Sequence, residues 1–213
     1  MKVEFKPENF NLLHKVIQVS TARYLLVPLY FARNMLTWSG RENLPPRGTP
    51  MLVVPNHLSS WDPPVTIIAT DRPCAFVAKE ELFDVKHFNK LIEYYNAISI
   101  NREKPEKSTF KSVKQIFKAG WSVCMYIEGT RARTSGVLGP PHLGAAYLAR
   151  SNKVPICPIG IVGTDKRFKK AHAKIGKLIQ PGDDLEKTTW QVMESLSELT
   201  GFSLPQTREL EKM

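Results

Sequence analysis

A histidine and an aspartate in one short run have the spacing of an acid–base pair. His57 and Asp62 lie in NHLSSWDPP, directly after the apolar run MLVVP. Four intervening residues let the carboxylate reach one ring nitrogen, which would fix the tautomer and leave the other nitrogen to take a proton. Such a pair can activate a hydroxyl of the substrate, so no serine nucleophile is needed. The simpler alternative is that Asp62 caps the helix that the two prolines begin, and that His57 is a turn residue.

A second polar run, EGTR at residues 128–131, follows the apolar run VCMYI. Gly129 allows the backbone to come close to a ligand, and Thr130 offers a hydroxyl and a backbone donor. Arg131 adds a planar guanidinium fork that suits a phosphate. The run is a candidate substrate site, and the alternative is a solvated turn with an exposed salt bridge.

Two further cations stand at the ends of apolar runs. Lys79 follows CAFVA, and Arg102 follows AISIN. Alone, each would be interpreted as a solvated charge. Together with Arg131 and the histidine–aspartate pair, they place polar groups at four expected strand ends, where the ligand sites of α/β sheets lie. The combination therefore favours one shared site over four unrelated surface groups.

The elements that position these groups alternate between short apolar runs and helical patterns. This alternation predicts an α/β fold, with a mixed, largely buried β-sheet flanked by helices. Several expected strands are apolar throughout, which is typical of strands covered on both faces. Gly120 follows one expected helix at the position of a C-cap glycine. We expect strands at 51–55, 74–78, 97–100, 123–127, 155–162 and 174–179, and helices at 63–69, 107–119, 143–151 and 184–200.

An uncharged stretch, residues 24–32, precedes these elements and lies between Arg23 and Arg33. It has about half of the ~20 apolar residues that are needed to cross a bilayer. As a helix bent at Pro28, it would instead suit the membrane interface, because cations frame a broad apolar face. An N-terminal core helix is the alternative. The side chains of the expected apolar face are Leu25, Leu26, Leu29, Tyr30 and Phe31.

The composition sets the class of protein. The 213 residues are 42% hydrophobic and 23% charged, which excludes a disordered, collagen-like or disulfide-scaffold protein. The length suits one core, so we expect a membrane-associating helical segment over residues 1–40 and a single α/β domain over residues 41–213. Lys+Arg 30 against Asp+Glu 20 give a net charge of +10, which predicts an anionic partner. Three widely spaced cysteines form no metal or disulfide pattern and predict a reduced, intracellular protein.

Taken in order, the polar runs resemble the sequence blocks of the glycerolipid acyltransferases, over residues 52–163. NHLSSWD matches the block NHxSxxD, which implies that His57 is the general base and Asp62 its orienting partner. VPICPI resembles a later, proline-bearing block, which implies a structural or acyl-pocket role for Pro155. The blocks KxEL, ISINR and EGTR imply substrate-binding roles for Lys79, Arg102, Glu128, Gly129, Thr130 and Arg131.

Three positions depart from the family's pattern. Ile127 stands where a proline commonly precedes EGTR, and Asn101 stands where an acidic residue is often found. The run PPHLG at residues 140–144 lacks the lysine that often lies near its glycine. All three lie around the expected phosphate site and leave the activation chemistry intact.

The resemblance implies an enzyme of phospholipid biosynthesis. It would move a fatty acyl group from acyl-CoA or acyl carrier protein to the free hydroxyl of 1-acylglycerol 3-phosphate, giving phosphatidic acid. We expect no metal and no cofactor besides this co-substrate. The expected partners are the acyl thioester donor, the lysophospholipid acceptor and an anionic membrane, and no nucleic acid. We expect a peripheral or monotopic protein on the cytoplasmic face of the cell membrane.

The basic run DKRFKK, residues 165–170, could also face anionic headgroups, with an ordinary solvated loop as the alternative. Two other functions remain open. One is acylation of glycerol 3-phosphate or of another lysophospholipid. The other is a basic membrane- or nucleic-acid-binding module without activity, although the sequence has no zinc, helix-turn-helix or aromatic-basic strand signature.

Overall fold

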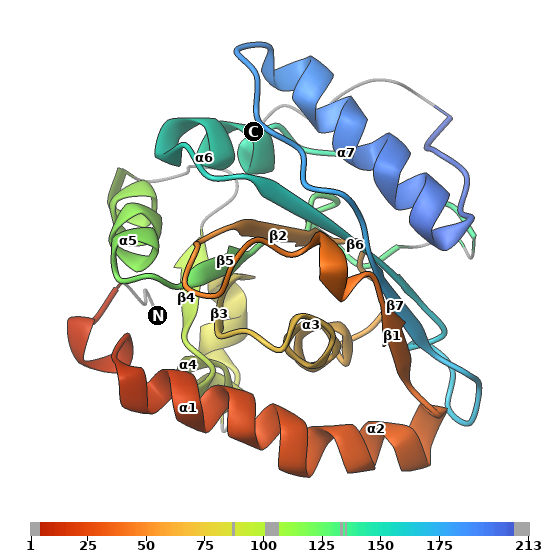
Figure 1. Ribbon diagram of the computed structural model, residues 1–213, viewed down its shortest axis with the longest axis horizontal. Helices are drawn as coiled ribbons and strands as arrows, with labels where there is room; N and C mark the ends of the chain where they lie inside the picture. The colour runs from red at the N-terminus through yellow and green to blue at the C-terminus, as the bar shows by residue number, and fades with distance from the viewer. Residues whose placement is uncertain (1–4, 87, 101–106, 133, 135, 207–213) are drawn as a thin grey trace.

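The computed structural model is built around one seven-stranded sheet with helices over both of its faces (Figure 1). The expected α/β fold and mixed sheet are therefore confirmed. The structure describes residues 5–86, 88–100, 107–132, 134 and 136–206.

The sheet is formed by β1 (Thr37–Ser39), β2 (Leu52–Pro55), β3 (Cys74–Lys79), β4 (Ala97–Ile100), β5 (Ser122–Cys124), β6 (Ile156–Val162) and β7 (His172–Ile175). The strand order is β1-β7-β6-β2-β5-β3-β4, and only β6 and β7 pair in the antiparallel sense. Because β2 lies between β6 and β5 in a parallel arrangement, the carboxyl ends of these three strands meet at one edge. Ligand sites of open α/β sheets form at such edges.

Four of the six expected strands are found within one residue of their predicted bounds. The other two were misplaced: the strand expected at 123–127 ends at Cys124, and the one expected at 174–179 runs from His172 to Ile175. Apolar residues continue past Cys124, but there the chain leaves the sheet for the candidate site. Strand β1 was not predicted, because three residues at a sheet edge are too few for a periodic pattern.

All four expected helices are present: α3 (Asp62–Thr70), α5 (Lys107–Lys118), α6 (Gly144–Asn152) and α7 (Leu185–Thr200). Gly120 has a φ of 71°, and its N–H donates to the carbonyl of Phe117, so it ends α5 as predicted. Asp184 caps α7 by accepting from the N–H of Lys187. A further helix, α4 (Phe88–Tyr94), was not predicted.

Two apolar cores lie on opposite faces of the sheet. Successive residues of β2 alternate between them, as the pleat requires. Leu52 and Val54 pack in the core formed with α5, α6 and α7, whereas Val53 packs in the core formed with α3 and the N-terminal helices. Strand β2, which leads to His57, is thus buried from both sides.

The N-terminal helical segment consists of α1 (Leu12–Thr21), a π-helical turn η2 (Ala22–Leu26) and α2 (Val27–Asn34). It runs along one side of the molecule (Figure 1). Pro28 has no N–H and its ring crowds the carbonyl four residues earlier, which explains why the helix widens just before it. The division between residues 1–40 and 41–213 stays a prediction, and β1, from the first segment, pairs with β7.

The apolar face expected over residues 24–32 is only partly exposed. Leu25, Leu29 and Phe31 are exposed, with 46–63% of their surface accessible. Leu26 and Tyr30 are buried in the core, so their assignment to an outer face was wrong. The buried pair is four residues apart, which is the spacing of one helix face.

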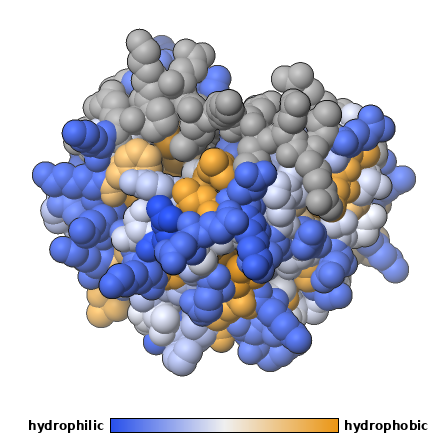
Figure 2. Space-filling model, turned by 90° about the horizontal axis from the view of Figure 1, so that it is seen from above, coloured by the Kyte–Doolittle hydropathy of each residue, from blue (hydrophilic) through white to orange (hydrophobic). Residues whose placement is uncertain are grey.

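The molecule's apolar surface is unevenly distributed. In the N-terminal helices, Leu12, Leu13 and Val16 are exposed as well as the three residues named above. Figure 2 views the molecule from above the side that carries α7, where hydrophilic residues predominate and the hydrophobic ones form small separate groups. Within the described residues, no helix is long and apolar enough to cross a membrane.

Candidate active site

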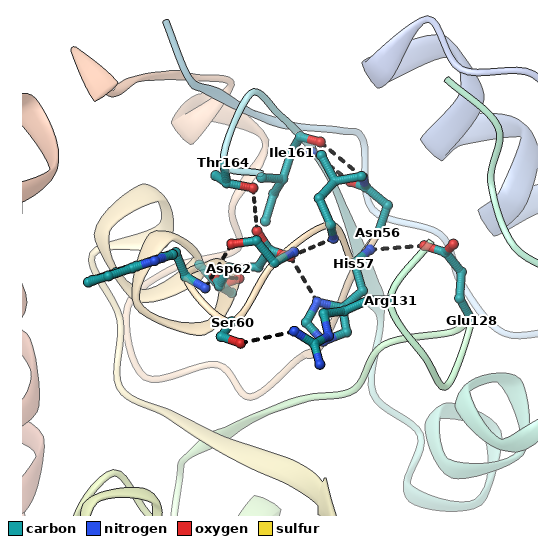
Figure 3. A network of polar contacts seen from close by, with 12 residues as sticks. Asn56, His57, Ser60, Asp62, Glu128, Arg131, Ile161 and Thr164 are labelled. Carbon is teal, nitrogen blue, oxygen red and sulfur yellow. Dashed lines mark hydrogen bonds and ion pairs between the residues drawn. The ribbon is translucent and has the colours of Figure 1, made fainter. Parts of the chain in front are cut away.

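His57 and Asp62 meet where the chain leaves β2 (Figure 3). Nδ1 of His57 lies 2.8 Å from Oδ2 of Asp62. The loop between them is anchored by β2 on one side and by the first residue of α3 on the other. The His57 side chain is 17% exposed and that of Asp62 is fully buried. The contact expected from the spacing is present, and the imidazole is the partner that solvent can reach.

Asp62 does not cap its helix, contrary to the N-cap interpretation. Helix α3 begins at Asp62 itself, with Trp61 in the cap position. The Oδ2 atom of Asp62 accepts from the backbone N–H groups of Leu58 and Ser59, at 2.6 and 2.7 Å. Its Oδ1 atom accepts from the hydroxyl of Thr164 at 2.5 Å. The carboxylate is therefore held from two directions. One is the loop of residues 57–62, named the catalytic loop, and the other is the segment that follows β6.

This arrangement determines which nitrogen of His57 can act. Hydrogen bonds replace the water that the buried carboxylate of Asp62 has lost. Because Nδ1 of His57 faces a carboxylate oxygen, its role is that of a donor, and Nε2 is left to accept a proton. The pair has the geometry of a general base and its orienting group.

Tyr126 forms the wall against which the imidazole lies. The two rings stack with their centroids 3.9 Å apart and their planes 19° from parallel. Tyr126 follows β5, and burial raises the pKa of its hydroxyl well above the ordinary value. The stack fixes the plane of the His57 ring. The sequence places Tyr126 only in an apolar run, because a stacking partner leaves no spacing pattern.

Glu128 joins the catalytic loop to a second loop. One carboxylate oxygen accepts from the backbone N–H of His57 at 2.9 Å, and the other accepts from Gly139 at 2.6 Å. A Cβ atom at Gly139 would lie 2.9 Å from the Glu128 carboxylate, so a side chain there would displace it. Burial raises the pKa of Glu128. These contacts favour a positioning role for Glu128 over the direct substrate contact that the resemblance implies.

The rest of the EGTR run lies beside the same loop. Gly129 has a φ of 67°, which favours glycine, and its N–H donates to the carbonyl of Tyr126. Arg131 and Thr130 are exposed. The guanidinium of Arg131 donates to the hydroxyl of Ser60 at 3.3 Å, within the loop that joins His57 to Asp62. Arg131 is thus a cation next to the dyad and open to solvent.

Of the two remaining expected cations, Lys79 and Arg102, the structure describes only Lys79. Lys79 ends β3, and its ammonium lies 2.9 Å from a carboxylate oxygen of Glu81, on the surface. Lys79 lies at the same carboxyl edge of the sheet as the His57–Asp62 pair, because β3 is parallel to its neighbour β5. Arg102 lies outside the described residues.

Two further residues complete the frame of the site. Asn56, fully buried, donates to the carbonyl of Ile161 and accepts from its N–H, at 2.9 and 2.6 Å. This reciprocal pair locks the ends of β2 and β6 together (Figure 3). Thr164 follows β6 by two residues. Neither Asn56 nor Thr164 was predicted as a site residue, although both are polar groups at strand ends, which gather at one edge of the sheet.

The chain is an α/β protein with a largely parallel sheet, and a His–Asp pair with the geometry of a general base and its orienting group lies at the carboxyl edge of that sheet. Residues 35–162 match the family model described as Acyltransferase. The matched range includes His57, Asp62 and Arg131, and it covers more than half of the chain. The chain belongs to this Acyltransferase family.

Two curated relatives resemble the chain over part of its length. A chloroplastic 1-acyl-sn-glycerol-3-phosphate acyltransferase from Brassica napus is 32% identical over 129 residues, which are 60% of this chain and 37% of that protein. A probable 1-acyl-sn-glycerol-3-phosphate acyltransferase from Mycoplasma genitalium is 34% identical over 138 residues, which are 59% of this chain and 51% of that protein. The chain therefore spans about half of these relatives or less.

A solved structure has the same fold. The crystal structure of the 1-acyl-sn-glycerophosphate (LPA) acyltransferase PlsC from Thermotoga maritima aligns with a TM-score of 0.69. The alignment covers 86% of this chain and 77% of that one, at 23% sequence identity.

Proposed function

We propose that this protein is an acyltransferase that moves a fatty acyl group from a thioester to the free hydroxyl of 1-acylglycerol 3-phosphate, giving phosphatidic acid. Family membership and the activity in the relatives' names support this reaction. The observation that carries it is the 2.8 Å contact between Nδ1 of His57 and the buried Asp62, with the His57 side chain partly exposed.

In the proposed reaction, Nε2 of His57 removes the proton from the glycerol hydroxyl. The oxygen attacks the thioester carbonyl and forms a C–O bond, while the carbonyl π electrons move to its oxygen. When the tetrahedral intermediate collapses, the C–S bond breaks and the thiolate takes the proton from the imidazolium. Asp62 stabilises that imidazolium. A positioned base contributes about 10²–10⁴-fold, and alignment of the two substrates supplies much of the rest.

The acceptor phosphate would lie against Arg131, whose guanidinium is exposed beside the dyad. Lys79, from the same sheet edge, would add charge once its surface pair with Glu81 opens. Surface ion pairs of this kind contribute about 0–1 kcal/mol, so a dianionic phosphate can compete for the lysine. Either acyl-CoA or acyl carrier protein would present the required thioester.

We further propose that the protein binds an anionic membrane at the cytoplasmic face, as a peripheral or monotopic protein. The exposed Leu25, Leu29 and Phe31 would enter the interface. Both flanking cations are held by the protein: Arg23 pairs with Asp71 at 2.7 Å, and Arg33 lies 4.8 Å over the Trp61 ring. These two contacts attach the segment to the rest of the fold.

The experiment is a thiol-release assay with a panel of acceptors. Purified protein receives acyl-CoA or acyl carrier protein thioester together with lysophosphatidate, glycerol 3-phosphate or an uncharged lysolipid. Fastest release with lysophosphatidate, with phosphatidic acid as product, supports the proposal. Preference for another acceptor corrects the substrate. Absence of thioester consumption with every pair would overturn the enzymatic function and favour a binding module.

A further inference from the structure

Helix α2 directs two buried polar side chains toward the catalytic loop and toward the segment that follows β6. Tyr30 is 0% and Asn34 1% exposed, although α2 lies at the surface of the fold. Their spacing of four residues puts both on the inner face of the helix. A buried polar group costs free energy unless it is hydrogen-bonded, so their partners explain why they are tolerated.

Tyr30 holds the residue that precedes Asp62. Its hydroxyl donates to the backbone carbonyl of Trp61 at 2.6 Å, and the two rings meet edge to face at 5.4 Å. Burial, followed by the nearby charge of Asp62, raises the pKa of Tyr30, so the hydroxyl keeps its proton and remains a donor. The start of α3 is thereby fixed to α2.

Asn34 holds the segment that carries Thr164. Its amide nitrogen lies within hydrogen-bond distance of three carbonyls, those of Gly163, Lys166 and Lys169, at 3.2, 2.6 and 3.0 Å. Gly163 directly precedes Thr164, whose hydroxyl donates to Asp62. Asn34 thus fixes the second support of the same carboxylate.

We propose that Tyr30 and Asn34 are positioning residues for the reaction, because together they set the Asp62 carboxylate from two sides: Tyr30 through Trp61, and Asn34 through Gly163 and Thr164. This inference rests on the proposed role of the His57–Asp62 pair. A base works only while its orienting group is in place, and displacements well below 1 Å in such supports reduce turnover.

Tyr30→Phe is the sharpest test, since it removes one hydroxyl and leaves the ring packing intact. We expect kcat to fall about 3- to 10-fold, as one buried hydrogen bond allows, with both KM values unchanged. Tyr147→Phe is the matched control: Tyr147 is partly exposed on α6, on the other face of the sheet, and should retain full activity.

A second readout does not depend on turnover. Among the described residues, Asp62, Tyr126 and Glu128 contact the His57 ring or its peptide, and Tyr30→Phe leaves all three in the chain. If Asp62 loses one support, the hydrogen bond from Nδ1 of His57 to its carboxylate should weaken. The NMR signal of the Nδ1 proton should therefore shift upfield in Tyr30→Phe relative to wild type and to Tyr147→Phe. This signal is informative even if the proposed acyl transfer proves wrong.

Asn34→Ala tests the second support, with Asn43→Ala as its control. Asn43 donates one hydrogen bond, to the carbonyl of Ile175, and has no link to Asp62. If Asn34→Ala does not fold, the double variant Tyr30→Phe/Thr164→Val replaces it: both changes act through Asp62, so their combined loss should be smaller than the product of the single losses.

The proposal is overturned if folded Tyr30→Phe has the kcat and the His57 Nδ1-proton signal of Tyr147→Phe. It is also overturned if the losses in the double variant multiply, because the two supports would then act independently. Wild-type protein without acyl transfer, but with the expected change in the His57 Nδ1-proton signal in Tyr30→Phe, would refute the proposed reaction and keep the positioning role.

Discussion

The hydroxyl of Thr164 donates to Oδ1 of Asp62 at 2.5 Å, across 102 residues of sequence. The other oxygen of the same carboxylate accepts from His57 and from two backbone N–H groups. Thr164 is thus the partner that orients the carboxylate from outside its own loop. It follows β6, which is parallel to β2, so the topology of the sheet brings the two residues together.

Replacement of Thr164 tests this support directly. Thr164→Val keeps the shape of the side chain and removes the hydroxyl, which leaves Oδ1 of the buried Asp62 unpaired. We expect kcat to fall about 10-fold or more, because an unsatisfied buried group costs about 1–3 kcal/mol. Thr164→Ser should restore most of the activity. Equal kcat values for folded Thr164→Val and wild type would show that Oδ1 of Asp62 needs no hydrogen-bond partner.

Glu128 provides a prediction on pH. Burial raises its pKa, so the folded chain binds this proton more tightly than the unfolded chain does. Its contribution to the free energy of unfolding is therefore largest below the ordinary pKa and is lost as the pH rises through the raised value. The free energy of unfolding can be measured for wild type and Glu128→Gln by urea denaturation. The value for wild type minus that for Glu128→Gln should increase as the pH falls from 7 towards 4. A difference independent of pH would contradict this assignment.

Arg131 should determine the use of a phosphorylated acceptor. Arg131→Lys retains the charge and loses the planar fork, so KM for lysophosphatidate should rise several-fold, and Arg131→Ala should raise it further. An uncharged monoacylglycerol serves as the control substrate and should be used equally by all three proteins. Identical lysophosphatidate saturation curves for wild type and Arg131→Ala would make Arg131 a purely structural residue.

The exposed face of the N-terminal helices should bind lipid. We expect the triple change of Leu25, Leu29 and Phe31 to Ser to weaken sedimentation with anionic vesicles more than 10-fold, because each large apolar side chain contributes up to about 1.5–3 kcal/mol when buried. Leu26 stays unchanged because it belongs to the core. Tyr147→Ser is the control. Salt at 1 M, where the Debye length is about 3 Å, should weaken binding without abolishing it.

Two outcomes would contradict that account of the membrane contact. Complete release of the wild type by salt would mean that no apolar face is inserted. Unchanged vesicle binding by the folded triple variant would mean that another surface carries the contact, and the basic run at residues 165–170 would be the next to change. Its Phe168 is 68% exposed.

The sequence was sufficient for the parts of the fold that have a local pattern. Four of the six apolar strands, the C-cap at Gly120 and the short loop between His57 and Asp62 all follow from neighbours in the chain. Strand β1 and helix α4 were not predicted, because such short elements leave no clear periodic pattern. The split of residues 24–32 into exposed and buried side chains was missed because a membrane face and a core face use the same residue types.

The supporting residues of the site could not be predicted in the same way. Thr164, Asn34 and Tyr30 reach the Asp62 region only through strand order and helix docking, which are long-range properties. Glu128 was expected to touch substrate because it belongs to the EGTR block, and its carboxylate is instead occupied by two backbone N–H groups. Sequence blocks thus identify the residues of a site more readily than they identify the role of each residue.

The proposed function depends on one step, the activation of the acceptor hydroxyl by His57 with Asp62 as its orienting partner. The most direct measurement is the rate of acyl transfer to lysophosphatidate by His57→Ala and Asp62→Asn, with folding checked by circular dichroism. We expect His57→Ala to lose about 10²–10⁴-fold in kcat while the protein stays folded, and Asp62→Asn to be strongly impaired because the amide no longer fixes the tautomer. Near-normal turnover by folded His57→Ala would show that His57 is not the general base.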